Sequence, residues 1–89
     1  MNPSKQLRGR HALVTGATSG IGLGIARALA DAGCHLTVNG FGEAGEIERL
    51  CLDLGRRNDG EAAHSSADLR DPIQIEDMVL GAMEARGPI

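Results

Sequence analysis

The chain has 89 residues, a length that allows one small domain. Its net charge is −3 and its aromatic content 1%, which argues against nucleic acid and anionic membranes as partners, because these surfaces require basic patches or aromatic platforms. No apolar run approaches the roughly 18 residues of a membrane span, and Met1–Arg10 lacks the apolar segment of a secretory signal. Cys34 and Cys51 form neither a CxxC pair nor a ligand set with histidine, so we expect two reduced thiols, no metal site and a cytoplasmic protein.

A short apolar run opens the first predicted unit. Residues 11–15 (His-Ala-Leu-Val-Thr) end at Gly16 and predict a buried parallel strand. From residue 20 to 32 apolar side chains recur at helical spacing, at Ile21, Ile25, Leu29 and Ala32. Gly33 then predicts a left-handed cap that ends this helix.

Two further strand–helix units follow. Residues 35–39 predict a second strand, and residues 43–57 a helix with one apolar stripe and two arginines in its last turn, where they complement the helix dipole. Residues 63–67 are a weak third strand, expected mainly from the alternation. A third helix is predicted to begin with Asp71 as its cap, Pro72 in its first turn and Gln74 completing a capping box. Its predicted inward side chains are Ile75, Met78, Val79, Ala82 and Met83.

The alternation β-α-β-α-β-α predicts an α/β fold with a parallel sheet and right-handed crossovers. It matches the N-terminal half of a Rossmann-type doubly wound parallel sheet, namely strands 3, 2 and 1 of the order 3-2-1-4-5-6. We therefore expect residues 1–89 to form one partial dinucleotide-binding (Rossmann) domain, truncated before the fourth strand.

Three glycines lie between the first strand and the first helix in the pattern G-x-x-x-G-x-G, at Gly16, Gly20 and Gly22. The first lets the chain turn sharply, the second removes a side chain where a diphosphate approaches the helix, and the third lets the helix lie close to the strand. The free amides and the dipole of the helix N-terminus then bind the anion. Such a cluster alone would be only a turn, but its position between strand and helix favours dinucleotide binding, and no Lys-Ser or Lys-Thr follows as a P-loop requires.

Other predicted cofactor-binding residues surround these glycines. Thr18 and Ser19 offer hydroxyl donors beside phosphate or ribose, and Ile21 belongs to the same turn. The second strand ends at residues 39–41 (Asn-Gly-Phe), with neither an acid for the ribose hydroxyls nor an arginine for a 2′-phosphate. The missing cation favours NAD over NADP. Phe41 either lies on the adenine or packs on the sheet edge.

The third strand is followed by Asp68 and Leu69, near the expected adenine pocket. The Asp68 carboxylate can accept a hydrogen bond from the adenine amino group, and the Leu69 amide can donate one to a ring nitrogen. The alternative is that Asp68 is only a turn residue. The three histidines, His11, His35 and His64, are predicted at or near strand starts, away from the ligand-binding edge, and are interpreted as structural or solvated.

Residues 15–22 (TGATSGIG) and residues 67–69 (Ala-Asp-Leu) resemble the N-terminal part of a short-chain dehydrogenase/reductase. Within that family the D-3-hydroxybutyrate dehydrogenases are most similar, on residues 20–26, on residues 39–42 followed by 46–48, and on residues 68–72. The resemblance implies an NAD cofactor and a full-length parent that oxidises 3-hydroxybutyrate to acetoacetate by hydride transfer to NAD, as a cytoplasmic homotetramer.

The resemblance also implies groups that this sequence lacks. The family's Asn-Asn-Ala-Gly segment, catalytic serine and Tyr-x-x-x-Lys pair would follow Ile89, whereas this chain has no tyrosine and one lysine, Lys5. No residue is therefore predicted to be catalytic. Two alternatives remain open: a stand-alone nucleotide-binding module, and an inactive gene remnant without catalysis.

Overall fold

A three-stranded parallel sheet forms the centre of the computed structural model, which describes residues 6–89. The sheet order is β1-β2-β3, and each strand is parallel to its neighbour. The elements in chain order are β1 (His11–Val14), α1 (Gly20–Asp31), β2 (His35–Asn39), α2 (Ala44–Asn58), β3 (Ala62–Ser65) and α3 (Pro72–Arg86). This arrangement confirms the predicted α/β fold class, the first half of a Rossmann-type sheet.

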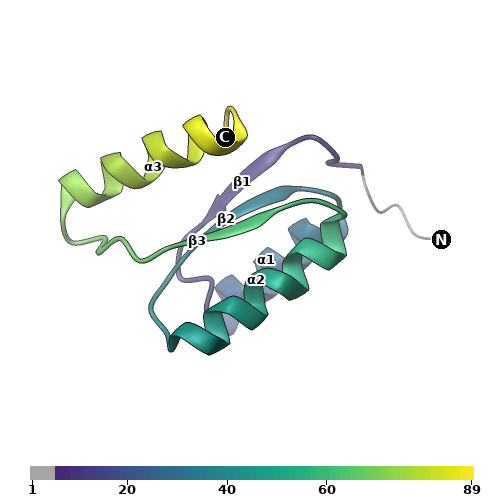
Figure 1. Cartoon of the computed structure of the whole chain (residues 1–89), viewed down its shortest axis with the longest axis horizontal. Helices are drawn as coiled ribbons and strands as arrows, with labels where there is room; N and C mark the ends of the chain where they lie inside the picture. Colours follow the sequence, from purple (N-terminus) through teal and green to yellow (C-terminus); the bar gives the residue numbers. More distant parts are fainter. Residues whose placement is uncertain (1–5) are drawn as a thin grey trace.

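Helices cover both faces of the sheet (Figure 1). Helices α1 and α2 pack side by side on one face, and α3 lies on the other. The core lies on the α1–α2 side, where Leu36 and Val38 of the central strand and Leu54 of α2 are fully buried. The thiol of Cys34 belongs to this core and that of Cys51 is half-buried at its margin; both are free, as predicted.

Helix α1 buries a different face from the one that its large apolar residues suggest. Ile21 is 84% exposed and Ile25 is 49% exposed, whereas Ala26 and Ala30 are fully buried. The cause is a close approach of helix and strand, since a Cβ atom added to Gly22 would overlap the carbonyl group of Gly16. Small side chains fit the closest part of this interface, and Leu29 of the apolar stripe packs at the margin of the core, so the apolar spacing predicts the helix but only part of its buried side.

The ends of α1, α2 and β3 differ from the predicted ends by no more than two residues. Gly33, after α1, has φ +99°, which confirms the left-handed glycine at that end. Glu43 is the cap of α2 rather than its first residue, and its side chain accepts a hydrogen bond from the Glu46 amide at 2.9 Å. Strand β3 is shorter than predicted, because residues 66 and 67 turn away from the sheet.

Helix α3 starts as predicted at Asp71, whose side chain accepts from the Ile73 amide at 3.0 Å. The predicted capping box is wrong. The Asp71 amide donates to the carbonyl of Asp68 at 3.0 Å, so Gln74 instead accepts from the Asp68 amide, at 2.9 Å. The side chain of Gln74 therefore ties the start of α3 to the segment that follows β3.

The inward face of α3 is narrower than predicted. Met78 and Ala82 are buried and Ile75 and Val79 are half-buried, but Met83 is 43% exposed, so its predicted burial is wrong. The apolar residues of α3 are spread around the helix, and only a strip of them meets the sheet. None of the helices within residues 6–89 is long and apolar enough to cross a membrane.

Candidate functional site

Three connecting segments meet at the carboxyl edge of the sheet, where ligands bind in open α/β folds. They are the turn of residues 15–19 after β1, the loop of residues 40–42 after β2, and the segment of residues 66–69 after β3. Hydrogen bonds join them to one another. The amide of Ala17 in the turn donates to the carbonyl of Asn39 at 2.8 Å.

The turn has the backbone geometry that its glycines allow. Gly16 and Gly20 have φ values of +61° and +59°, in the left-handed region that other residues rarely adopt. Gly22 brings the first turn of α1 against the Gly16 carbonyl, as described above. These three conformations direct the N-terminus of α1 towards the carboxyl edge of the sheet.

The N-terminus of α1 has no side-chain cap. Ser19 is the N-cap residue, yet its side chain makes no capping hydrogen bond, and the first turn contains no acidic residue. The other helices within residues 6–89 are capped by carboxylates, α2 by Glu43 and α3 by Asp71. The first amides of α1 and its positive dipole end therefore remain available to an anion. Ile21 lies at this end with its side chain in solvent.

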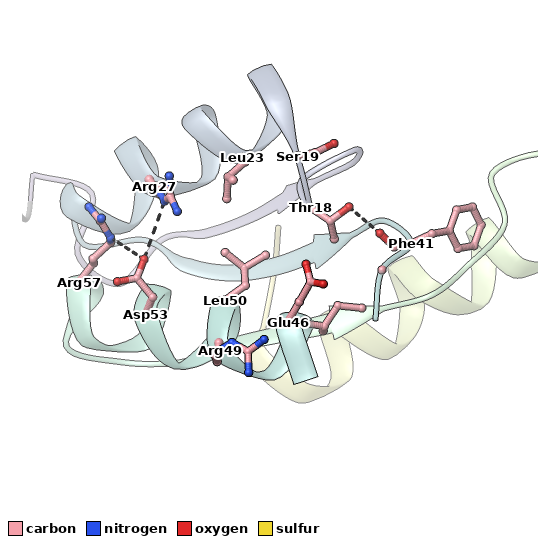
Figure 2. A pocket seen from close by; sticks show the side chains of 12 residues that line it. Thr18, Ser19, Leu23, Arg27, Phe41, Glu46, Arg49, Leu50, Asp53 and Arg57 are labelled. Carbon is pink, nitrogen blue, oxygen red and sulfur yellow. Dashed lines mark hydrogen bonds and ion pairs between the residues drawn. The ribbon is translucent and has the colours of Figure 1, made fainter. Parts of the chain in front are cut away.

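The loop of residues 40–42 lies beside the turn and is connected to it by Thr18. The Thr18 hydroxyl donates to the carbonyl of Phe41 at 2.8 Å, so its one proton is used within the protein (Figure 2). A Cβ atom at Gly40 would lie 2.7 Å from that hydroxyl oxygen, so a larger residue would displace it. Phe41 is 69% exposed, and its ring points away from α1 and α2. It is therefore free to contact a ligand rather than packed on the sheet edge.

Asn39 is a structural member of this site that the sequence interpretation missed. Its side chain is 2% exposed, and its amide nitrogen donates to the carbonyls of Ser65 and Ala67 at 3.2 and 3.0 Å. It thereby fixes the segment after β3 relative to the end of β2. A polar residue at the last position of a strongly buried strand was the available signal, since buried amides find partners.

The positions of the histidines agree with the prediction in two cases and contradict it in the third. His11 begins β1, where its Nε2 is 2.8 Å from Thr37 Oγ1, and His35 begins β2. His64 is instead opposite Val38, near the carboxyl edge, and its Nε2 is 2.6 Å from the carbonyl oxygen of Gly40. The predicted end of β3 was two residues too late, at residue 67 rather than Ser65, which placed His64 too far from this edge.

Asp68 and Leu69 lie on the third segment. The Asp68 carboxylate accepts from the Arg70 guanidinium at 2.7 and 3.0 Å and from the Arg70 amide at 2.9 Å. These hydrogen bonds hold the pKa of Asp68 below its usual value, with the guanidinium as the larger cause. Asp68 is therefore an ionised acceptor at neutral pH, and Leu69 beside it is 44% exposed.

A groove of about 670 Å³ leads from this edge between α1 and α2 (Figure 2). Thr18, Ser19 and Phe41 line one end. At the other end Asp53 pairs with Arg57 at 2.9 Å and approaches Arg27 at 3.9 Å. Hydrogen bonds to Asp53 and Asp31 raise the pKa of Arg57. Within residues 6–89 no group of three histidine, cysteine or acidic side chains is placed to hold a metal ion.

The groove also contains cations that lie on its helices and not at the end of β2. Arg27 of α1 and Arg49 of α2 both line it. The sequence interpretation looked for a cation only beside Asn39, because that is where the strand ends. Helix α2 runs along the same groove, so Arg49 and Arg57 line one cavity together with residues of the turn and the loop.

Comparison with known proteins identifies the family. The model of the short chain dehydrogenase family matches residues 10–89, and the chain belongs to this family. It is similar to D-beta-hydroxybutyrate dehydrogenase of Rhizobium meliloti (strain 1021), with 44% identity over 76% of this chain and 26% of the relative. The enzyme of the same name from Cupriavidus necator is 45% identical over 82% of this chain and 28% of its own length.

Solved structures show the same fold. A blue fluorescent protein from a metagenomic library, in complex with NADPH, superposes with a TM-score of 0.85 and 30% identity, over 93% of this chain and 34% of that one. The NADH-dependent reductase A1-R′, complexed with NAD, gives a TM-score of 0.83 and 27% identity, over 96% of this chain and 35% of that one. The chain thus spans about a quarter to a third of the length of the proteins it matches.

Proposed function

We propose that this chain binds the ADP portion of NAD at the carboxyl edge of its sheet. The observation that carries this proposal is the uncapped N-terminus of α1 directly after a turn with two left-handed glycines. The pyrophosphate would accept hydrogen bonds from the amides of Gly20, Ile21 and Gly22, with Ser19 as a hydroxyl donor. Gly16 and Thr18 would act indirectly, the first by shaping the turn and the second by holding the neighbouring loop.

The adenosine would lie over the other two segments. The exposed ring of Phe41 offers an apolar surface to the adenine, and the ionised Asp68 can accept from its amino group. The Leu69 amide would donate to a ring nitrogen. In this proposal Arg70 keeps the Asp68 carboxylate oriented, and the remaining lone pairs of the carboxylate stay available to the base.

We propose NAD rather than NADP as the natural cofactor. Residues 39–42 contain no cation that could neutralise a 2′-phosphate. The two solved structures described above contain NADPH in one case and NAD in the other, and the groove brings Arg27 and Arg49 into the same cavity as the turn. The binding experiment therefore compares the affinity of the chain for NAD with its affinity for NADP.

We further propose that the chain acts as the cofactor-binding part of a longer, cytoplasmic, homotetrameric dehydrogenase. The similarity to two D-beta-hydroxybutyrate dehydrogenases supports 3-hydroxybutyrate as its substrate and acetoacetate as its product. Bound NAD would accept the hydride from the carbon that carries the hydroxyl group. We assign no chemical step to residues 1–89, whose part would be to bind and orient the dinucleotide as a partial Rossmann domain.

Titration calorimetry of the chain with NAD and NADP tests the binding proposal. The critical variant is Ser19→Asp, which places a carboxylate at the uncapped N-terminus. Because its charge complements the helix dipole, it is expected to stabilise the fold by about 0.3–1 kcal/mol. By occupying and repelling the anion site it is expected to weaken NAD binding by at least about tenfold.

The matched control is Gln6→Glu, which adds the same charge at an exposed position before β1. It should leave NAD binding unchanged. Undetectable binding of millimolar NAD by the unmodified chain, or equal affinity of the Ser19→Asp variant, would contradict the proposal.

A further inference from the structure

The loop of residues 40–42 separates two hollows in the surface. On one side is the groove between α1 and α2, which Phe41 and Gly42 line. On the other is a second cavity of about 310 Å³, lined by Gly40, Phe41, Gly42, Ala44, Ile47, His64 and Ser66. With a hollow on either side and two glycines among three residues, the loop has few packing contacts, chiefly of Gly40 with Thr18 and of Gly42 with Ile47.

Side-chain hydrogen bonds hold the loop from both sides instead. Thr18 donates to the carbonyl of Phe41 from the turn, at 2.8 Å, and His64 reaches the carbonyl of Gly40 from β3, at 2.6 Å. The one backbone bond of the loop to β3, from the Gly40 amide to the Ser65 carbonyl, is long at 3.4 Å. The two side chains are therefore the stronger of the restraints on the loop within the described residues.

The contact also specifies which nitrogen of the imidazole carries a hydrogen. A carbonyl oxygen can only accept, so His64 Nε2 must carry the hydrogen and donate it to Gly40. The neutral ring is then the Nε2–H tautomer. A glutamine at this position would keep an N–H donor, whereas a leucine would keep the approximate volume and remove the donor.

We propose that His64 is a positioning residue for cofactor binding, which sets the distance between Phe41 and the turn by holding the Gly40 carbonyl. This inference rests on the proposed binding of the adenosine over Phe41. It assigns a function to a residue whose side chain contacts the loop and not the ligand. Loss of its hydrogen bond lets the loop move into the cavity beneath it, and the Phe41 ring then leaves the adenine site.

The test compares His64→Leu and His64→Gln by calorimetry with NAD and by amide hydrogen exchange without ligand. We expect His64→Leu to weaken NAD binding about tenfold and to speed exchange of the Gly40 amide, which donates to the Ser65 carbonyl, with exchange in α1 and β1 unchanged. His64→Gln should restore most of both. The control is His35→Leu, at the opposite end of the sheet, which should leave the loop and the NAD affinity as they are.

The ligand-free readouts keep this inference separate from the proposed function. If the unmodified chain binds no NAD, the proposed function fails, and the hold of His64 on the loop is judged by exchange and by the ¹⁵N signals of its ring. An Nδ1–H tautomer of His64, or unchanged loop exchange in His64→Leu, overturns the inference. If NAD binds and the loop loosens while its affinity stays the same, His64 is structural only and the inference is equally overturned.

Discussion

At the scale of single residues, Asn39 shows how a buried amide organises a surface site. Its side chain donates to the carbonyls of Ser65, the last residue of β3, and of Ala67 in the segment that follows, and its backbone carbonyl accepts from the turn after β1. Asn39 of the central strand thus contacts the turn after β1 and the segment after β3, and the loop of residues 40–42 follows it directly in the chain. Its contribution is positional, because at 2% exposure the side chain offers no surface to a ligand.

We predict that Asn39→Asp destabilises the chain, although an acid at the end of the second strand is a common ribose-binding solution. The carboxylate would face the Ser65 and Ala67 carbonyls with no proton to donate, so we expect the free energy of unfolding to fall by about 2 kcal/mol or more. Urea denaturation measures this change. Gln6→Glu, the same chemical change at an exposed residue, should have almost no effect, and an equal loss in both variants would refute the prediction.

The contacts of Asn39 and His64 lay beyond what the sequence could predict. Both depend on the register between β2 and β3, which pairs Val38 with His64 and Asn39 with Ser65. A shift of one residue reverses the face to which each side chain points. The glycine turn was predictable, because its conformations depend on residues that are adjacent in the chain. Whether Phe41, Asp68 and Leu69 contact a cofactor stays a prediction.

At the scale of elements, the three helices and strands β1 and β2 were predictable from periodicity and end signals, which are local, whereas β3 was expected mainly from the alternation of strands and helices. The buried side of α1 was not. Its orientation follows from the close approach of Gly22 to Gly16, a tertiary contact that favours small residues over the larger isoleucines. The Gln74 side chain was predicted to accept from the Asp71 amide, but that amide already donates to the carbonyl of Asp68, and Gln74 accepts from the Asp68 amide instead.

We predict that the alanine face of α1 tolerates less change than its isoleucine face. Ala26→Leu inserts extra volume where the helix meets the sheet, and we expect it to cost about 1–3 kcal/mol of unfolding free energy. Ile25→Ala removes a side chain that is 49% exposed, and we expect about 0.5 kcal/mol. Urea midpoints of the two variants give the comparison. A larger loss for Ile25→Ala would mean that α1 packs through its isoleucines.

At the scale of the whole molecule, the described residues divide into a body and a more weakly attached helix. Strands β1–β3 with α1 and α2 share one core. Helix α3 adds the buried side chains of Met78 and Ala82, and its C-terminal end is attached by two polar contacts. These are the hydrogen bond between His11 Nδ1 and the Gly87 carbonyl, at 3.1 Å, and the approach of Arg86 to Glu61, at 3.7 Å.

We therefore predict that amide hydrogens exchange faster in α3 than in α1 and α2, because fewer apolar contacts oppose its local opening. His11→Ala should accelerate exchange in the last turns of α3 while leaving α2 unchanged. His35→Ala is the control, since the hydrogen bond of its ring is to the amide of Glu61, at 3.4 Å, and not to a group of α3. Uniform acceleration throughout the chain would show that α3 and the body open as one unit.

The contact between Gly22 and Gly16 also affects which parts of the candidate site can change their spacing on substitution. At the proposed pyrophosphate end, backbone meets backbone, so the spacing is set by atomic radii and does not vary with rotamers. At the proposed adenosine end, the spacing is set by two side chains, Thr18 and His64, that substitution can alter. If a dinucleotide binds as proposed, substitutions in residues 40–42 would change the preference between NAD and NADP while leaving the binding of the diphosphate as it is.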